Sequence, residues 1–78
     1  MSVRVLYFAS LRDAAGCESE SVERDRSLAD LYETLADRHG FALRKAQVRV
    51  AVNGDFVAWE RELADGDEVV FLPPVSGG

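Results

Sequence analysis

The sequence is poor in the residues that build metal-held or disulfide-held scaffolds. Cys17 is its only cysteine, so the chain can form no internal disulfide and no site that needs two to four thiolates. A reactive thiol is the alternative, but no basic residue adjoins Cys17 to favour a thiolate, and we interpret it as a loop residue. His39 is the only histidine, and we expect it to stabilise a helix end rather than to act in catalysis. The sequence therefore predicts no metal site.

Long apolar runs and an excess of basic residues are also missing. No apolar stretch approaches the ~20 residues that span a bilayer, and Met1 leads into a strand pattern rather than a signal peptide. The 14 acidic and 9 basic side chains give a net charge of -5, which repels a phosphate backbone. These absences argue against a membrane or nucleic-acid partner and predict a cytoplasmic protein.

The length permits one compact domain. At 78 residues, folding buries only about 60% of the surface of the unfolded chain. A deep pocket of roughly 300 Å³ or more would remove much of so small a core. We therefore expect function at the surface or at a terminus.

Alternating apolar residues predict the strands of a sheet. In the first strand Val3, Val5 and Tyr7 share one face. Asn53-Gly54 predicts a tight hairpin because both residues tolerate positive φ. The predicted strands span residues 3–9, 18–23 (a short edge strand), 47–52, 56–57 and 68–72.

One main helix is predicted from a cap and an apolar repeat. Ser27 is a typical N-cap, apolar residues then recur at helical spacing, and Gly40 ends the pattern. Residues 10–16 form a connection with room for a helical turn. The predicted order ββαβββ favours an α+β domain, in which the helix covers one face of a mixed sheet of four or five strands.

The other face of that sheet is predicted to carry exposed apolar side chains. Because successive side chains of a strand point to opposite faces of the sheet, Phe8 and Leu72 are expected to point outward. If the first and last strands run side by side, these two residues come together, with Phe56 near them, and we interpret the cluster as a docking surface. The alternative is ordinary exposure, since over half of a folded surface consists of apolar atoms.

The C-terminal segment is predicted to be an extended tail. Pro73 and Pro74 end the last strand and separate a domain of residues 1–72 from a tail of residues 73–78. The last four residues reach roughly 13 Å, enough to enter the active site of another protein. Because the two terminal glycines have no side chains, they can enter a narrow active-site channel of a partner protein. The alternative is a frayed end. The four residues are Val75, Ser76, Gly77 and Gly78.

The chemistry expected of such a tail lies in its terminal carboxylate. A carboxylate is a poor electrophile, but joining it to a nucleotide as an acyl-adenylate supplies a leaving group, after which a sulfur donor could form a thiocarboxylate on Gly78. The tail carries no base and no metal ligand of its own, so a partner must supply the activation. This pattern favours a carrier and co-substrate over an enzyme.

The chain resembles the small, sulfur-carrying subunit of molybdopterin synthase, a family with the ubiquitin-like β-grasp fold. The resemblance covers nearly every segment, and the ending Pro-Pro-Val-Ser-Gly-Gly is far more specific than Gly-Gly alone. The stretches that carry it are residues 5–9, 11–12, 51–53, 63–69 and 71–78.

This resemblance implies a reaction cycle and a set of partners. An adenylating enzyme would activate Gly78 with ATP, a sulfur donor would form the thiocarboxylate, and the tail would enter the large synthase subunit. There the sulfur would pass to a cyclic pyranopterin monophosphate, twice for each dithiolene, in a heterotetramer of two large and two small subunits. No cofactor would stay bound to the chain. Phe8, Phe56 and Leu72 match the docking patch of the family, which often has phenylalanine in place of Leu72.

Three other functions remain open from the sequence. A carrier for thiazole or tRNA thiolation also ends in Gly-Gly, although such proteins usually lack the preceding Pro-Pro-Val. A ubiquitin-like modifier would form isopeptide bonds through Gly78. A binding module with an inert tail would work without Gly77 and Gly78.

Overall fold

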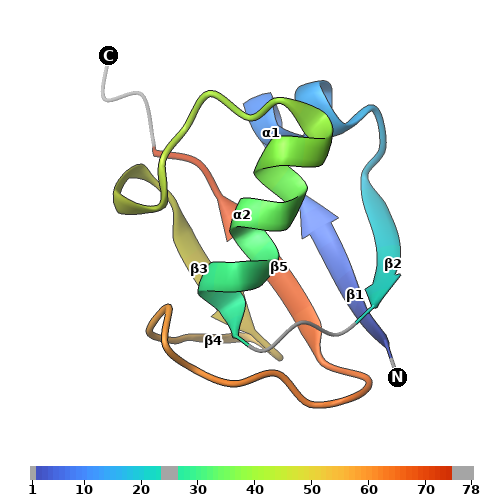
Figure 1. Cartoon of the computed structure of the whole chain (residues 1–78), viewed down its shortest axis with the longest axis vertical. Helices are drawn as coiled ribbons and strands as arrows, with labels where there is room; N and C mark the ends of the chain where they lie inside the picture. Colours follow the sequence, from blue (N-terminus) through green and yellow to red (C-terminus); the bar gives the residue numbers. More distant parts are fainter. Residues whose placement is uncertain (1, 24–26, 75–78) are drawn as a thin grey trace.

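The computed structural model describes residues 2–23 and 27–74. Within them, five strands form one mixed sheet, and helix α2 lies across one face of it (Figure 1). The elements in chain order are β1 (Ser2–Tyr7), α1 (Ala9–Ala15), β2 (Ser19–Glu23), α2 (Leu28–His39), the 3₁₀ turn η1 (Lys45–Gln47), β3 (Arg49–Val52), β4 (Asp55–Phe56) and β5 (Glu68–Leu72).

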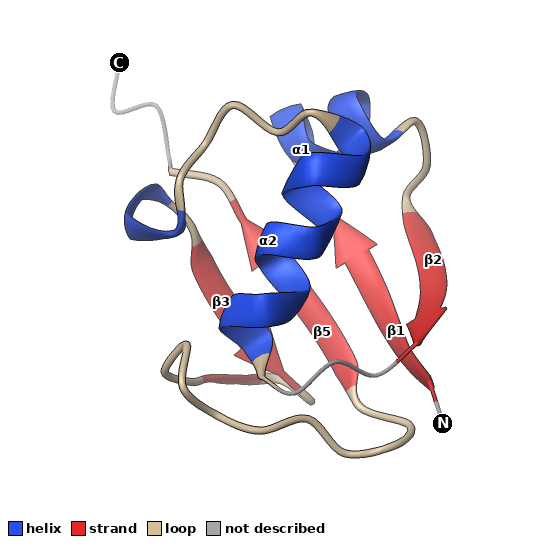
Figure 2. Ribbon diagram, viewed as in Figure 1, coloured by secondary structure: helices blue, strands red, loops and turns tan. Residues whose placement is uncertain are grey.

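The strand order β2-β1-β5-β3-β4 places the first and last strands side by side within the sheet. β1 and β5 run parallel, whereas the other neighbouring strands are antiparallel (Figure 2). A parallel pair needs a long crossover, and the segment that contains α2 provides it. The prediction that the first and last strands are neighbours is confirmed, as is the mixed five-stranded sheet.

The core lies between α2 and one face of the sheet. The alternation predicted for β1 and β5 is confirmed, because every second residue of each strand is buried and the residues between them are not. α2 contributes one apolar stripe at helical spacing. The largest fully buried side chains are Tyr7, Tyr32, Phe71, Leu11, Leu28, Leu31 and Leu35.

The predicted turn and cap signals hold in the structure. Ser27 Oγ accepts a hydrogen bond from the Asp30 backbone N–H at 3.3 Å, and Gly40 ends α2 in the left-handed conformation. Asn53 and Gly54 both adopt positive φ, of 52° and 92°, and join β3 to β4. These values are those of a tight two-residue hairpin.

The predicted bounds of four strands were wrong. Strand β2 begins at Ser19, one residue later than predicted. The first strand ends at Tyr7, and the expected connection is α1, a helix of seven residues that Leu11 anchors in the core. Helix formers such as alanine and arginine make this segment helical once Leu11 is buried. The strand predicted from residue 47 begins at Arg49, because the residues before it form η1. Strand β4 ends at Phe56, one residue earlier than expected.

Cys17 lies in the bend between α1 and β2, as predicted for a loop residue. It is half-buried and packs against the core. No helix in the described part of the chain combines the length and the apolar character needed to cross a bilayer.

Candidate functional site

The sheet face opposite α2 carries an apolar patch. Phe8 and Phe56 are its most exposed members, with 45% and 60% of their surface accessible. Leu6, Val70 and Leu72 are half-buried beside them. We call these five residues the open-face patch. Large apolar side chains left in contact with water in one area are typical of an interaction surface.

Strand pairing makes one continuous row of this patch. Leu6 of β1 pairs with Val70 of β5, and Val70 pairs with Ala51 of β3. Ala51 in turn pairs with Phe56 of β4. Directly paired residues point to the same face of a sheet. The row therefore crosses four strands.

A second row lies beside the first, toward the end of β5. Leu72 pairs with Arg49 of β3, and Phe8 lies one residue beyond the pair formed by Tyr7 and Phe71. Phe8 and Leu72 are thus neighbours, as expected. Phe56 belongs to the same face but lies on the far side of β3. Arg49, the register partner of Leu72, has its guanidinium 4.7 Å from the centroid of the Phe56 ring.

Phe8 is held where β1 turns into α1. It is the extended residue before the helix, and Ala9 follows it with a φ of 50°, a conformation that residues with a Cβ rarely adopt. A hollow of about 270 Å³ adjoins Phe8, and Arg4 and Arg12 contribute to its lining. The turn therefore points Phe8 away from the core beside two basic side chains.

The predicted tail leaves the sheet from the same patch. Pro73 and Pro74 follow Leu72 without regular secondary structure, Pro73 half-buried and Pro74 exposed. The remaining predicted site residues, Val75, Ser76, Gly77 and Gly78, lie outside the described residues. The roles predicted for the tail and for the patch therefore stay predictions.

A polar cluster between the sheet and α2 was not predicted. The Tyr7 hydroxyl donates a hydrogen bond to Glu20 Oε2 at 2.5 Å, and His39 Nε2 lies 2.7 Å from the same oxygen. These three side chains join β1, β2 and the last turn of α2. His39 thus has a carboxylate partner in addition to the helix end at which it was expected. The only hint in the sequence is that Glu20 shares the inward face of β2 with Val22.

The cluster changes the acidity of two of its members. Burial raises the pKa of Tyr7, and the hydrogen bond to Glu20 adds to the effect. Burial also opposes ionisation of Glu20, but hydrogen bonds from Tyr7 and His39, and the nearby Arg38, outweigh it, so the pKa of Glu20 lies below its usual value. The cluster therefore holds an ionised carboxylate between strand and helix.

A second polar network was not predicted from the sequence, although Asn53, Ala64 and Asp67 lie in the stretches that carry the resemblance. Asp67 is buried, and its carboxylate accepts hydrogen bonds from Asn53 Nδ2 and the Ala64 N–H, each at 2.9 Å. Arg61 lies 3.2 Å from the same carboxylate. The Ala64 N–H, with help from Asn53 and Arg61, lowers the pKa of Asp67. This network fixes the hairpin and the following crossover to the start of β5, so its role is structural.

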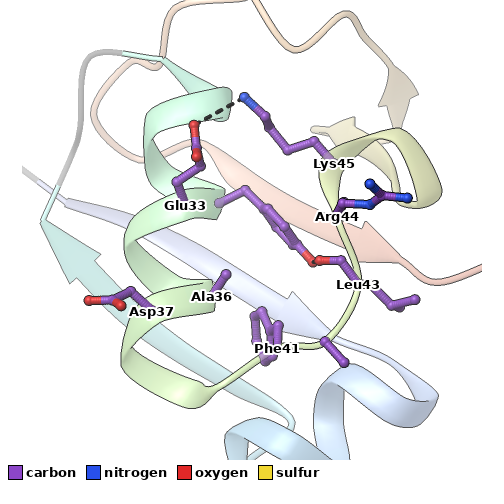
Figure 3. Close-up of a pocket in the computed structure, with 9 residues that line it drawn as sticks. Glu33, Ala36, Asp37, Phe41, Leu43, Arg44 and Lys45 are labelled. Atoms are coloured by element: carbon purple, nitrogen blue, oxygen red, sulfur yellow. Dashed lines mark hydrogen bonds and ion pairs between the residues drawn. The ribbon is translucent and has the colours of Figure 1, made fainter.

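A shallow groove lies on the helix side of the molecule (Figure 3). It has a volume of about 540 Å³ and runs between α2 and the segment that leads into η1. Phe41 and Leu43 supply apolar walls, and an ion pair of 3.1 Å joins Glu33 to Lys45 at its edge. The groove lies across the core from the open-face patch, and its described lining residues include no nucleophile paired with a base.

Comparisons with a protein-family model and with a named relative show the family of this chain. The model of the ThiS family matches residues 5–78, so the match includes the whole tail. The molybdopterin synthase sulfur carrier subunit of Escherichia coli strain K12 is 36% identical over 80 residues, which cover 97% of this chain and 99% of that protein.

Solved structures resemble the chain over its full length. The small archaeal modifier protein 1 of Methanosarcina acetivorans superposes with a TM-score of 0.82 at 28% identity, covering 99% of this chain and 96% of that one. A subunit in the complex of subunits 1 and 2 of the molybdopterin-converting factor from Helicobacter pylori gives 0.71 at 26% identity, covering 100% of both chains. The predicted ubiquitin-like β-grasp fold is confirmed. The chain therefore belongs to the ThiS family and, within it, to the family of molybdopterin synthase sulfur carrier subunits.

Proposed function

We propose that this chain carries sulfur as a thiocarboxylate on Gly78 and donates it within molybdopterin synthase. The single observation that supports this most is the family match, which runs without a break from β1 through the last residue of the Pro-Pro-Val-Ser-Gly-Gly ending. The relative from Escherichia coli, matched over nearly its whole length, is named for the same role. The acceptor that we propose is cyclic pyranopterin monophosphate, which becomes the dithiolene of molybdopterin.

The proposed activation proceeds in two substitutions. A carboxylate oxygen of Gly78 attacks the α-phosphorus of ATP and releases pyrophosphate, which leaves an acyl-adenylate. A sulfur donor at the oxidation level of sulfide then attacks the acyl carbon, AMP departs with the bonding electrons, and the thiocarboxylate remains. Both steps take place in a partner enzyme of the adenylating class, because the tail supplies no acid, base or metal ligand. The chain itself acts as co-substrate and not as the catalyst.

The open-face patch is the surface that we assign to docking. It adjoins the start of the tail, since Leu72 is both a member of the patch and the last residue of β5. A partner that covers Phe8 and Leu72 is therefore positioned to receive Gly78 in its active site. We propose that the large synthase subunit and the adenylating enzyme use this surface in turn, and that the synthase contains two large and two small subunits. The similar subunit from Helicobacter pylori was solved in a complex of subunits 1 and 2, which supports a partner of this kind.

Mass spectrometry tests the proposed chemistry. Incubation with the adenylating enzyme of the same organism, ATP and a sulfide source should replace one oxygen of the C-terminal peptide by sulfur. The matched control is the same mixture without ATP, which should leave the peptide unchanged. An unmodified C-terminus in the complete mixture, with an enzyme shown to modify another carrier, would contradict the proposal.

A second candidate function is protein modification. The observation that favours it is the close superposition on small archaeal modifier protein 1. In that case activated Gly78 would form isopeptide bonds with lysines of other proteins. Conjugates that persist on denaturing gels, and that disappear when Gly78 is deleted, would support this function over sulfur transfer.

A further inference from the structure

Arg49 is a charged residue inside the open-face patch. It is exposed, pairs across β3 and β5 with Leu72, and lies with its guanidinium 4.7 Å from the centroid of the Phe56 ring. Its neighbours on the two sides are thus apolar members of the patch. Within residues 2–23 and 27–74, no carboxylate forms an ion pair with Arg49.

The other arginines near this face differ from Arg49 in having acidic neighbours. Arg12 lies 3.8 Å from Glu18. Arg4 forms no ion pair with a carboxylate of the described residues, but its register partner on β5 is the acidic Glu68, whereas that of Arg49 is Leu72. Among the described residues, Arg49 thus combines two features, the lack of an ion pair with a carboxylate and a position between apolar members of the patch, in a chain with a net charge of -5. Its charge is therefore available to a partner.

A partner that covers the patch must also cover this charge. Removing a guanidinium from water without a counter-charge is costly, whereas a carboxylate can accept two parallel hydrogen bonds from it. The ring of Phe56 supports one side of the guanidinium, so that less side-chain freedom is lost on pairing. An apolar partner surface without an acidic residue would thus be rejected at this point.

We propose that Arg49 determines the specificity of the open-face patch: it selects a protein partner whose apolar contact surface presents an acidic side chain opposite the guanidinium. The inference rests on the proposed function, which makes this patch the docking surface for the large synthase subunit. It adds a chemical requirement for the partner, one carboxylate at the junction of Leu72 and Phe56.

Titration calorimetry with the purified large synthase subunit of the same organism tests the requirement. Arg49→Leu keeps an apolar side chain at the site, and its Kd should rise about 30-fold, because a buried carboxylate on the partner loses its cation. Arg49→Glu should weaken binding further, since two carboxylates then face each other. Added salt should weaken the wild-type complex more than the Arg49→Leu complex.

Arg44→Glu is the matched control. It makes the same change of charge at an exposed arginine on the helix side, beside the groove of Figure 3. Its affinity should stay close to that of the wild type, and melting curves should show all variants folded. Replacing the partner's acidic residue by arginine should restore the affinity of the Arg49→Glu variant for that partner.

Two results would overturn this inference alone while the wild type still binds. One is an Arg49→Leu variant that binds as tightly as the wild type or more tightly. The other is an equal loss of affinity in Arg49→Glu and Arg44→Glu, which would show that only the net charge of the chain matters. A wild-type chain that does not bind the large subunit would overturn the proposed function and this inference together.

Discussion

The two faces of the sheet place the same kind of residue in opposite surroundings. Phe71 of β5 is fully buried, with its ring centroid 5.2 Å from that of Tyr32 and 5.9 Å from that of Trp59. Phe56 of β4 is mostly exposed and contacts Arg49. Burial of apolar surface stabilises the fold only where that surface has left water. The helix-covered face therefore supplies stability, and the open face remains available for a partner.

The first prediction separates the two faces by stability. Phe71→Ala should lower the free energy of unfolding by about 3–5 kcal/mol, because it removes a fully buried ring and leaves a cavity. Phe56→Ala should lower it by about 0.5 kcal/mol or less, as expected for an exposed position. Urea denaturation followed by circular dichroism measures both. Similar losses in the free energy of unfolding for the two variants would show that both faces contribute equally to stability.

The second prediction concerns binding. Phe8→Asp or Phe56→Asp should raise the Kd for the large synthase subunit about 30-fold or more, because a charge then lies in a desolvated apolar contact. The free energy of unfolding should change by only about 0.5 kcal/mol. Unchanged affinity together with a large drop in melting temperature would show that these rings are part of the core instead.

The third prediction tests the polar cluster under α2. Tyr7→Phe removes the hydroxyl that donates to Glu20 and should cost about 1–2 kcal/mol of stability, since a partly buried carboxylate loses a donor. Affinity for the large subunit should not change, because Tyr7 faces away from the open-face patch. A weaker complex with unchanged stability would contradict the division between the faces.

The smallest predicted effect is a pH dependence. The folded-state pKa of Glu20 and that of Asp67 both lie below their usual values, so these groups stabilise the fold above about pH 4. That contribution should be lost as the pH falls through the folded-state values. Glu20→Gln should flatten the acid side of a plot of stability against pH. A curve with the wild-type slope would show that the cluster does not hold its charge.

Features that depend on nearest neighbours in the sequence could be predicted. The alternation in β5, the cap at Ser27 and the Asn53-Gly54 turn are local properties, and all three appear where they were expected. The helix α1 was underestimated because its stability comes from burying Leu11 against the sheet, which no local pattern reveals.

Contacts between distant elements could not be predicted. The pairing of Glu20 with His39 requires the position of α2 over β2, and the contact of Arg49 with Phe56 requires the register of β3 and β4. Of the candidate site, the outward direction of Phe8 and Leu72 followed from the period of two. The place of Phe56 beyond β3 followed only from the strand order.

Deletion of Gly78, measured in a reconstituted molybdopterin synthesis, tests the central claim most directly. The truncated chain should yield no molybdopterin, because its terminal carboxyl carbon then lies one residue too early in the tail to reach the reacting position in the partner's active site. Its melting temperature should equal that of the wild type, since the buried core residues of the described chain lie between Val3 and Phe71. Molybdopterin formed at the wild-type rate by the truncated protein would contradict the role of this chain as a sulfur carrier.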